Sequence, residues 1–425
     1  MKKCFIFLVL LSSFRLYAQQ PHCHTDEYIK AQILNDPSYK KGIEAANQEV
    51  LNYMQSAAKK SGGDEVYTIP VVFHIVYNNG TEDIDDEQIF SQIQVLNEDY
   101  RRLNADADET PDAFADLAAD ALIEFKLAQY DEDGNPTTGI TRTETDITSW
   151  DLFASSTDDN FAENVKDSDD GGQDGWDRDC YLNIWVCDLN NEILGYATPP
   201  GGMSSKDGVV IGYQYIGLDG VGSGDYDMGR TATHEVGHWL GLSHVWGDDG
   251  TACSGSDFIA DTPNQTDETY GCPSFPKTDA CTPASPGVMF MNYMDYTNDD
   301  CMNMFTEGQV DKMRSVLESS RDEIVECTKA LVDIETAGVN DKGIYLDVFP
   351  NPSAGIFTVY VNNPEKVELT LEVYNIAGQM IYTNFENAAE DHSIKVDMSK
   401  FSEGIYQILV YDGKNYFTQQ LVIVK

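Results

Sequence analysis

Residues 230–244 read RTATHEVGHWLGLSH, and this stretch predicts both a helix and a metal site. On a helix, His234 and His238 lie one turn apart and face the same way, so both imidazoles can reach one metal ion. Glu235 is offset by about 100° around the helix and points toward a water at the metal rather than toward the metal itself. We therefore expect a helix over 230–241 that holds a metal on one face.

Gly241 and His244 complete this motif. Gly241 can adopt the left-handed conformation that ends a helix, and the turn that follows brings His244 to the metal as a third ligand. Three protein ligands leave one position open for water, which is typical of a catalytic rather than a structural zinc site. Three of only seven histidines have this spacing, so a chance match in an ordinary helix is disfavoured. The sequence predicts that the three histidines hold a catalytic Zn²⁺ and that Glu235 is the general base.

The flanking sequence predicts a mixed α and β domain around this helix. Residues 67–77, YTIPVVFHIVY, are strongly apolar and β-branched and indicate a buried strand. Residues 85–104 have apolar positions near helical spacing behind an acidic start, which indicates a helix. Further strands are expected at 121–130, 181–186, 194–197 and 209–213, and a helix at 306–326 closes the domain.

Changes of composition divide the chain into five segments. A basic start followed by a short apolar run is typical of a secretory signal peptide over 1–18. Residues 19–60 are polar and helix-prone, with little that could form a core, and are interpreted as a pro-segment. A catalytic domain is expected over 61–328 and a linker over 329–343. Short alternating strands separated by turns predict an all-β sandwich over 344–425.

The chain is strongly acidic, with 72 Asp and Glu against 27 Lys and Arg and a formal net charge of −45. Such a field repels phosphate backbones and anionic lipids, so binding to nucleic acid or to a membrane surface is disfavoured. Solubility explains much of the charge by itself, and the charge also favours cationic partners and bound Ca²⁺. No later apolar run reaches the ~18 residues that a transmembrane helix needs, so no transmembrane anchor is expected.

Eight cysteines remain after the expected signal peptide: Cys23, Cys180, Cys187, Cys253, Cys272, Cys281, Cys301 and Cys327. Cysteines in an exported chain indicate an oxidising compartment and disulfides. The four cysteines between positions 253 and 301 interleave and allow three pairings. Cys187 lies inside an apolar strand and is expected to be buried.

The zinc motif followed by NYMDY at 292–296 resembles the metzincin metalloproteases, which carry a methionine turn after the third histidine. In that family the methionine lies beneath the zinc as an apolar floor. In several branches a tyrosine two residues later turns toward the metal or the reacting oxygen. Met294 and Tyr296 match these two positions, so the resemblance implies a role for Tyr296 in catalysis.

The sequence around the motif is similar to that of one metzincin branch, the pappalysin family, over roughly residues 65–320. The matching stretches include IPVVFHIVY, LNEDYRR, YLNIWVC, LGYATPPGG, ADTPNQ and CMNMFTEGQ. The resemblance implies an endopeptidase with a twisted sheet, a backing helix and the active-site helix above an irregular lower lobe. Residues 194–197 are then the edge strand that pairs with extended substrate. Arg230 also recurs in the family just before the helix, but no chemical role is assigned to it. The resemblance also favours the disulfides Cys253–Cys281 and Cys272–Cys301.

Structural calcium in the lower lobe is a further implication of the resemblance. Hard oxygen ligands are offered there by Asp257, Asp261, Thr262 and Asp267. The alternative is a solvated acidic loop.

Cys23 lies in PHCHT, near the expected mature N-terminus. Its thiolate can take the open zinc position and keep a zymogen inactive until the pro-segment is removed. The spacing of Cys and Thr resembles the pro-segments of bacterial pappalysin-like proteases, although the two flanking histidines depart from that pattern. A disulfide with Cys327 is the alternative, and Lys59-Lys60 offers a site for removal.

The segment after the methionine turn, TNDDC at 297–301, bears on specificity. In metzincins this segment lines the pocket for the side chain that follows the scissile bond. One or both of the carboxylates of Asp299 and Asp300 in that pocket would pair with a guanidinium or ammonium, and related enzymes share a basic preference. Arg or Lys is therefore expected at P1′, directly after the scissile bond. The alternative is that both aspartates face solvent or bind calcium and leave a broad apolar pocket.

Residues 344–425 resemble the C-terminal sorting domain of the bacterial type IX secretion system, through FPNPSAGIFTVYV, LEVYNIAGQMIY and the terminal QQLVIVK. This implies export across an outer membrane by that machinery, followed by an extracellular or cell-surface location. An accessory substrate-binding sandwich is the alternative.

These observations together predict a secreted zinc endopeptidase that is made as a zymogen and acts on proteins or peptides. A catalytically weak surface adhesin on the same scaffold is the rival, and it has no need for the base Glu235. A zinc amidase acting on cell-wall peptides is disfavoured, because the sequence stretches quoted above are specific to the pappalysin family.

Overall fold

The structure is a computed structural model and describes residues 22–57, 65–135, 137–155, 157–190, 193–218, 220–222, 224–248, 252–327, 330–331, 345–362, 369–375, 380–386, 391–402, 404–411 and 416–424. The expected signal peptide, the Lys59-Lys60 site and nearly all of the expected linker lie outside these residues. No described helix is both long enough and apolar enough to cross a membrane.

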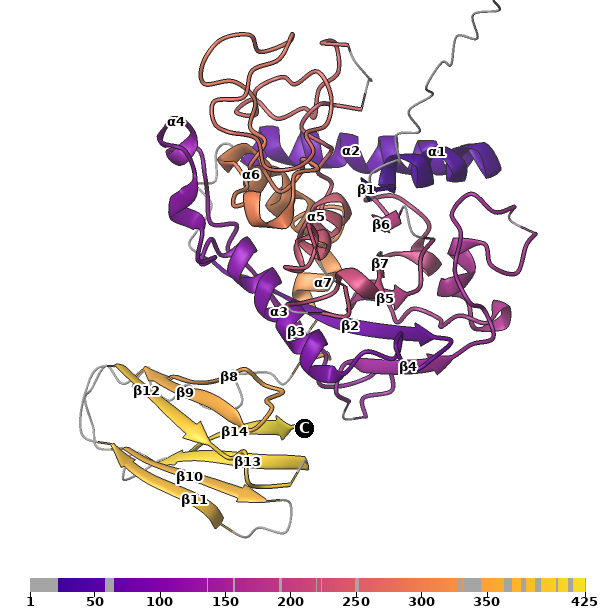
Figure 1. The fold of residues 1–425 in the computed structure, drawn as a ribbon. Helices are drawn as coiled ribbons and strands as arrows, with labels where there is room; N and C mark the ends of the chain where they lie inside the picture. The colour runs from indigo at the N-terminus through magenta and orange to yellow at the C-terminus, as the bar shows by residue number, and fades with distance from the viewer. Residues whose placement is uncertain are drawn as a thin grey trace, which may run out of the picture.

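A seven-stranded sheet forms one half of the catalytic domain (Figure 1). Its order is β1-β6-β7-β5-β2-β3, with β4 also paired to β2, and every pair is parallel except β6 with β7. The bounds are β1 (His22–Cys23), β2 (Tyr67–Tyr77), β3 (Ile123–Leu127), β4 (Ile140–Glu144), β5 (Leu182–Cys187), β6 (Ile193–Ala197) and β7 (Val209–Gly212). The apolar run over 67–77 is the central strand, as predicted. The polar β4 was not predicted, because its sequence ITRTE lacks a buried face.

Two helices connect this sheet to the site. Helix α3 (Asp86–Tyr100) begins at Asp85, whose side chain accepts a hydrogen bond from the Gln88 amide, a stabilising N-cap. Helix α5 (Arg230–Trp239) is buried along its whole length between the sheet and the lobe that follows it (Figure 1). Both helices match the sequence expectation.

The N-terminal segment packs on the catalytic domain. It consists of β1, α1 (Thr25–Asn35) and α2 (Pro37–Ala57). Residues 19–60 were expected to offer little that could form a core, and the structure differs from this in one respect. Tyr28, Tyr39, Ala46 and Val50 are buried, because they pack on the catalytic domain instead of forming a core of their own. Residue Gly42 comes so close to Gly201 that a Cβ built on it would lie 2.3 Å from the Gly201 carbonyl oxygen.

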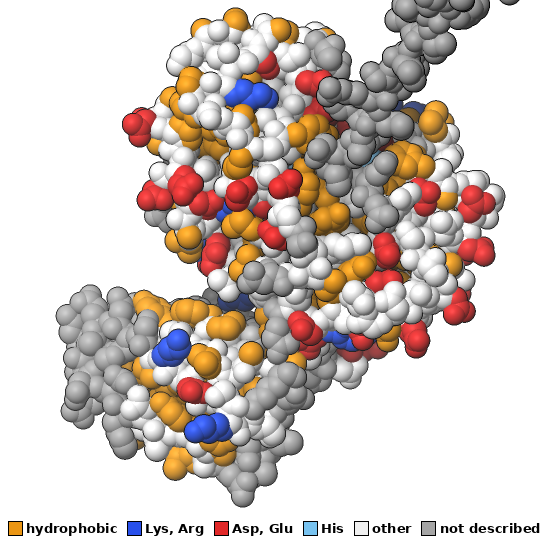
Figure 2. Space-filling model, viewed as in Figure 1, with side chains coloured by type: hydrophobic (Ala, Val, Ile, Leu, Met, Phe, Trp, Pro, Cys, Tyr) orange, Lys and Arg blue, Asp and Glu red, His pale blue; other side chains and the backbone are white. Residues whose placement is uncertain are grey.

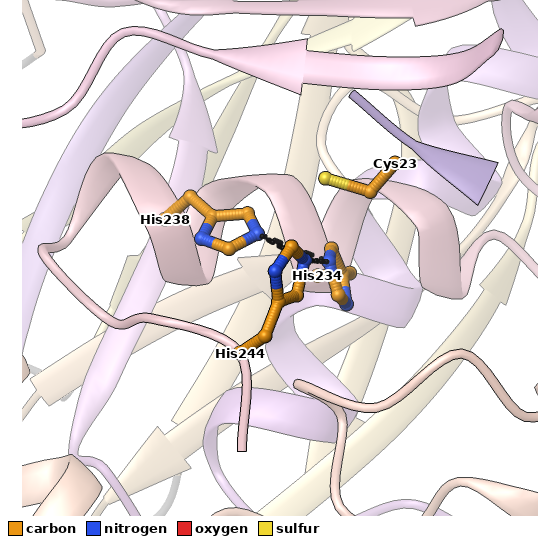
Figure 3. Close-up of side chains that lie close together, drawn as sticks. All are labelled: Cys23, His234, His238 and His244. Carbon is orange, nitrogen blue, oxygen red and sulfur yellow. Dashed lines mark hydrogen bonds between the residues drawn. The ribbon is translucent and has the colours of Figure 1, made fainter. Parts of the chain in front are cut away.

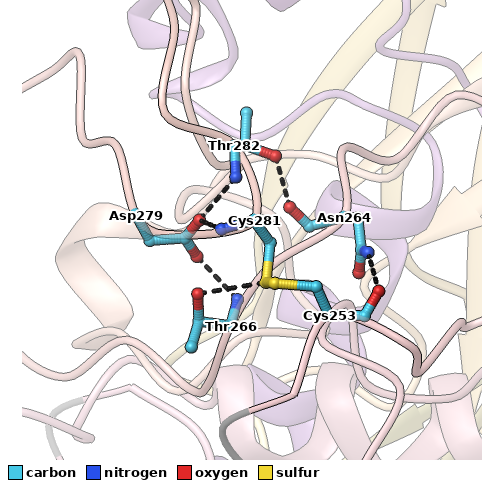
Figure 4. The surroundings of a disulfide bond; sticks show 6 residues. All are labelled: Cys253, Asn264, Thr266, Asp279, Cys281 and Thr282. Carbon is cyan, nitrogen blue, oxygen red and sulfur yellow. Dashed lines mark hydrogen bonds between the residues drawn. A yellow bond between two sulfur atoms is a disulfide. The ribbon is translucent and has the colours of Figure 1, made fainter.

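The lower lobe is irregular and cross-linked. Described residues from 252 to 298 contain no helix or regular strand. The structure has disulfides Cys180–Cys327, Cys253–Cys281 and Cys272–Cys301, and the last two are the pairs that the resemblance implies. Beside Cys253–Cys281, Asp279 accepts hydrogen bonds from the amides of Thr266, Cys281 and Thr282 (Figure 4). Because Cys327 is bonded to Cys180, the alternative Cys23–Cys327 disulfide is excluded.

The closing helix expected over 306–326 is divided. The structure has α6 (Glu307–Leu317) and α7 (Asp322–Glu326). Between them, buried Arg321 forms an ion pair with Asp207 and donates from Nε to the Trp239 carbonyl. This contact with the end of α5 turns the chain away from a continuous helix. The other short elements are α4 (Asp112–Ala115), η1 (Ala107–Glu109), η2 (Ala162–Lys166), η3 (Ser168–Asp170), η4 (Ser204–Lys206), η5 (Tyr213–Tyr215) and η6 (Asp299–Cys301).

The C-terminal unit is the predicted β-sandwich (Figure 1). One sheet has the order β11-β10-β13-β14 and the other β12-β9-β8. Its strands are β8 (Tyr345–Phe349), β9 (Ile356–Asn362), β10 (Leu369–Asn375), β11 (Met380–Glu386), β12 (Asp391–Asp397), β13 (Gly404–Tyr411) and β14 (Tyr416–Ile423). Apolar residues from both sheets, such as Val359 and Ile408, form a core of its own.

Candidate active site

Three histidines converge on one point. His234 and His238 project from α5, and His244 comes from the turn that follows it (Figure 3). The three Nε2 atoms lie 3.1 to 3.2 Å apart. Gly241 has φ +86°, the left-handed conformation expected of the residue that reverses the chain toward His244.

The other ring nitrogen of each histidine has its own partner. Nδ1 of His234 lies 2.7 Å from the Tyr293 carbonyl oxygen, and Nδ1 of His238 lies 2.9 Å from the Leu242 carbonyl oxygen. A carbonyl only accepts, so both rings carry their proton on Nδ1 and turn an unprotonated Nε2 inward. Burial and the neighbouring imidazoles hold the pKa of both rings well below the usual range.

These contacts fit a zinc ion. The inward lone pairs of His234 and His238 repel each other at this separation unless a cation or a proton lies between them. Tetrahedral zinc with nitrogen ligands at about 2.0–2.1 Å places those nitrogens roughly 3.3 Å apart, close to the distances observed. The third ring is oriented by Asp248, whose Oδ1 lies 2.7 Å from Nδ1 of His244, a carboxylate contact typical of metal-bound histidine.

Met294 and Tyr296 border the histidine cluster. Met294 is fully buried, and a Cβ built on Gly237 of α5 would lie 2.6 Å from its sulfur, so the helix and this methionine are in close contact. The Tyr296 ring lies 4.9 Å from the His244 ring and 5.7 Å from the His234 ring, between centroids. The methionine turn therefore packs against the site, as the resemblance implies.

Glu235 is fully buried beside the cluster and touches the N-terminal segment. Its Oε2 accepts a hydrogen bond of 2.8 Å from the Thr25 hydroxyl. Burial raises the pKa of Glu235 to about 7, while hydrogen bonds from Cys23 and Thr25 act in the opposite direction. A carboxyl group with a pKa near neutrality can both accept and return a proton.

Cys23 is placed at the histidine cluster by β1. Its sulfur and the ring nitrogens of the three histidines all lie within 4.8 Å of one another (Figure 3). Strand β1 pairs in parallel with β6, and Tyr296 donates a hydrogen bond of 2.9 Å to the Cys23 carbonyl. Burial raises the pKa of this thiol well above its usual range, so a thiolate here requires a compensating cation.

The two specificity candidates differ in position. Asp299 is buried and lines a pocket together with Glu235, Tyr226 and Tyr296. Its Oδ2 accepts from the backbone amides of Met228 and Arg230, and burial raises its pKa to about 7.

Asp300 does not line this pocket, so only one of the two candidate carboxylates, that of Asp299, lies there. It is exposed and lies beside the Cys272–Cys301 disulfide. Adjacent residues of the short helix η6 point in different directions, so only one of the two carboxylates can enter the pocket.

Arg230 links the site to helix α3, although the sequence assigned it no role. Its guanidinium makes two hydrogen bonds of 2.7 Å to Asp106 and a longer one to Asp99. Asp99 in turn accepts from the hydroxyl of Tyr293, the residue whose carbonyl holds His234. Arg230 is therefore connected to His234 through Asp99 and Tyr293.

The four calcium candidates do not form one cluster. Asp257 accepts from the Thr262 hydroxyl, whereas Asp261 accepts from the Thr306 hydroxyl and the Gly308 amide at the start of α6. Among the described residues, no three of the carboxylates named for calcium come within metal-binding distance of one another. Asp261 thus accepts a hydrogen bond from one of the free amides at the start of α6, whose N-cap is Thr306.

Sequence reasoning missed two parts of the site. One is Thr25, whose bond to Glu235 spans 210 positions. The other is the Asp99–Asp106 pair on Arg230. The spacing of Cys23 and Thr25 was noted in the sequence, but it did not identify Glu235 as the partner of Thr25. No spacing pointed to Asp99 and Asp106 as the partners of Arg230.

Comparisons with known proteins agree with this geometry. Residues 165–318 match the peptidase family described as pregnancy-associated plasma protein-A, and residues 347–424 match a secretion system C-terminal sorting domain. An extracellular metalloprotease of Arthroderma benhamiae is 31% identical over 271 residues, which span 62% of this chain and 83% of the relative.

Two solved structures from Tannerella forsythia are also similar. A promirolysin variant is 48% identical, with 74% of this chain and 100% of that chain covered and a TM-score of 0.65. Mature mirolysin in complex with a cleaved peptide is 57% identical, with 61% of this chain and 96% of that chain covered and a TM-score of 0.58. The match to the pro-form extends over more of this chain than the match to the mature form.

Proposed function

The chain belongs to the pappalysin family of metzincin metalloproteases, and we propose that its three clustered histidines hold the catalytic zinc and that Glu235 is the general base. The family membership makes the protein a secreted zinc metalloendopeptidase with a pro-segment and a type IX sorting tail. The assignment of residues is carried by one observation, the three Nε2 atoms that face one another 3.1 to 3.2 Å apart.

The chain's own groups then have separate tasks. Zinc, when bound, polarises the peptide carbonyl and lowers the pKa of water. Glu235 takes a proton from the attacking water and returns it to the leaving amine. Tyr296, whose hydroxyl now donates to the Cys23 carbonyl, is free to donate to the reacting carbonyl oxygen of substrate once β1 has left.

Zinc and Glu235 can be tested separately. Chelation should inactivate the processed enzyme, and added Zn²⁺ should restore activity. Metal analysis of His238→Ala should show loss of zinc, since one of three ligands is gone. An active enzyme without bound metal would overturn the proposal.

Latency is proposed to rest on Cys23 as the fourth zinc ligand. The position of its sulfur within the histidine cluster supports this. The parallel pairing of β1 with β6 adds a steric block, because β1 covers the edge strand on which an extended substrate would lie. Removal of the pro-segment then frees both the metal and the strand.

We further propose a preference for Arg or Lys at P1′, set by Asp299. The support is that this buried carboxylate lines the pocket beside Glu235 and Tyr296. A desolvated carboxylate pairs well with a guanidinium and is left unpaired by Leu.

Asp300 supplies a matched control, because it carries the same charge one residue away but is exposed. In a peptide library, Asp299→Asn should reduce the preference for Arg over Leu, whereas Asp300→Asn should leave it nearly unchanged. Equal cleavage before Leu and Arg in the wild type would sink the proposal. A preference that survives Asp299→Asn would place the recognising carboxylate elsewhere.

Calcium is proposed for the acidic lower lobe without a defined ligand set. Burial raises the pKa of both Asp257 and Asp295 to about 6, and a nearby cation would relieve that cost. Acidic side chains are spread over the visible face of the catalytic domain, where Lys and Arg are few (Figure 2). A melting temperature that is the same in Ca²⁺, Mg²⁺ and EGTA would remove calcium from the account.

The C-terminal domain directs secretion, and we propose that it has no part in catalysis. Its core is separate from that of the catalytic domain. Deletion of residues 344–425 should leave the purified protease active and abolish its appearance outside the native cell. Loss of activity in the purified truncation would favour a substrate-binding role instead.

A further inference from the structure

A row of four aromatic rings crosses the cleft at the histidine cluster. Phe153, His24, His22 and Tyr296 follow one another, with ring centroids 5.5, 4.2 and 5.5 Å apart. The two inner rings belong to the N-terminal segment and the two outer rings to the catalytic domain. Removal of that segment therefore takes away the planar partner of Phe153.

Phe153 is held outward by its turn. The Phe153 amide donates to the Asp151 side chain, and the Asp151 carbonyl accepts from the amides of Ala154 and Ala162. Leu152 is buried, while Phe153 is 62% exposed even with the N-terminal segment in place. A single exposed apolar side chain is ordinary by itself. The distinguishing feature of Phe153 is that its ring contacts the segment that fills the cleft.

Phe153 and the Asp299 pocket contact different residues at the start of that segment, on the two sides of Cys23. The pocket is lined by His22 and Cys23, whereas Phe153 contacts His24, on the other side of the zinc-facing Cys23. The His24 amide donates to the Gly195 carbonyl of β6, so this residue is held on the edge strand by a main-chain bond. An extended substrate on the same strand presents a side chain near Phe153 in the same way.

We propose that in the processed enzyme Phe153 forms a subsite for an aromatic side chain on the amino-terminal side of the scissile bond. The inference rests on the proposed function, since it takes the Asp299 pocket as the site of the residue after that bond. The edge-to-face packing of Phe153 on His24, with an interplanar angle of 73°, is the geometry that the substrate ring takes over. The enzyme thus recognises substrate side chains on both sides of the scissile bond, an aromatic side chain before it and a basic side chain after it.

The test is a peptide library cleaved by the processed wild type, Phe153→Ala, Phe153→Trp and Leu103→Ala. Leu103 is 70% exposed and lies outside the row of rings, so it controls for the loss of an exposed apolar side chain. Wild type should favour an aromatic residue over Ala at one amino-side position by roughly 3- to 10-fold in kcat/KM, the size expected of one ring pair. Phe153→Ala should abolish this ratio, and Phe153→Trp and Leu103→Ala should keep it.

Each position of the library reports a different claim. An aromatic preference that is absent from the wild type, or that survives Phe153→Ala, overturns the inference. If the aromatic preference is lost in Phe153→Ala but lies after the scissile bond, the placement of the Phe153 subsite on the amino-terminal side is overturned. The preference at P1′ tests the Asp299 proposal independently of the Phe153 subsite, so failure of the one proposal can be distinguished from failure of the other. Binding of a non-cleavable aromatic peptide to zinc-free enzyme should show the same loss in Phe153→Ala.

Discussion

The hydroxyl of Thr25 donates a 2.8 Å hydrogen bond to Oε2 of Glu235 and accepts one of 2.8 Å from the Ala197 amide of β6. The residue that is to act as general base is therefore engaged by the N-terminal segment, while the cysteine two positions earlier faces the histidines. Cys23 at the end of β1 and Thr25 at the start of α1 thus lie against the histidine cluster and Glu235, respectively.

Thr25→Val removes this hydroxyl at nearly constant shape. A hydrogen bond to a charged group contributes about 1.5–3 kcal/mol, so the rate at which the precursor activates itself should rise roughly 10-fold or more. Electrophoresis of the purified precursor over time measures that rate. An unchanged rate would show that the bond to Glu235 does not contribute to latency.

Cys23→Ala should produce a precursor with measurable activity before any cut in the pro-segment, because the metal position is no longer filled. Cys187→Ala is the matched control, since Cys187 is the other free buried cysteine of the described chain and lies in β5. A quenched peptide substrate follows the activity. If the Cys23→Ala precursor is as inactive as the Cys187→Ala precursor, the N-terminal segment inhibits the enzyme by steric blockade alone.

Gly42→Ala tests the docking of α2 at a distance from the metal. Alanine favours an isolated helix over glycine by about 0.5–1 kcal/mol, yet its Cβ would come within 2.3 Å of the Gly201 carbonyl oxygen. The clash should dominate, so faster activation and greater protease sensitivity of the pro-segment are expected. Gly80→Ala, where a Cβ meets nothing within 4 Å, should behave as the wild type. A Gly42 variant that is more latent than the wild type would contradict this packing.

The preference for a basic P1′ residue should depend on pH. Burial raises the pKa of Asp299 to about 7, so the carboxyl is mainly neutral below that pH and charged above it. The ratio of kcat/KM for Arg over Leu substrates should therefore increase from pH 6 to pH 8. In Asp299→Asn the ratio should be flat, and a wild-type ratio that falls with pH would contradict the assignment.

The same shift bears on stability. Native Asp299 binds its proton more tightly than the unfolded chain does, so its contribution is fully present below the unfolded pKa of about 4 and is lost as pH rises through about 7. A comparison of wild type with Asp299→Asn in urea across this window measures the difference.

The zinc helix and the central strand were predictable because each carries a strong local pattern. HEVGHWLGLSH joins helical spacing to a turn-forming glycine, and YTIPVVFHIVY is a continuous apolar run. The division of the helix over 306–326 was not predictable, since it depends on Arg321 reaching Asp207, 114 positions away. The different positions of Asp299 and Asp300 depend on how η6 is seated against α5, which no periodicity encodes.

The N-terminal segment shows a similar limit. Tyr28 and Tyr39 are unremarkable in a polar helical sequence, and their burial is decided by the surface of the catalytic domain on which they pack. The proposed role of Cys23 could be inferred from the sequence because a thiolate can occupy the open position of a zinc site. The role of Thr25 required the fold.

The most direct test of the central claim is Glu235→Gln in the processed enzyme, with bound zinc and peptide cleavage measured on the same sample. The account predicts zinc content equal to the wild type, because the histidines are untouched, and a fall in turnover of roughly 10²- to 10⁴-fold, the range of a lost general base. Cleavage at a near wild-type rate with zinc bound would contradict it.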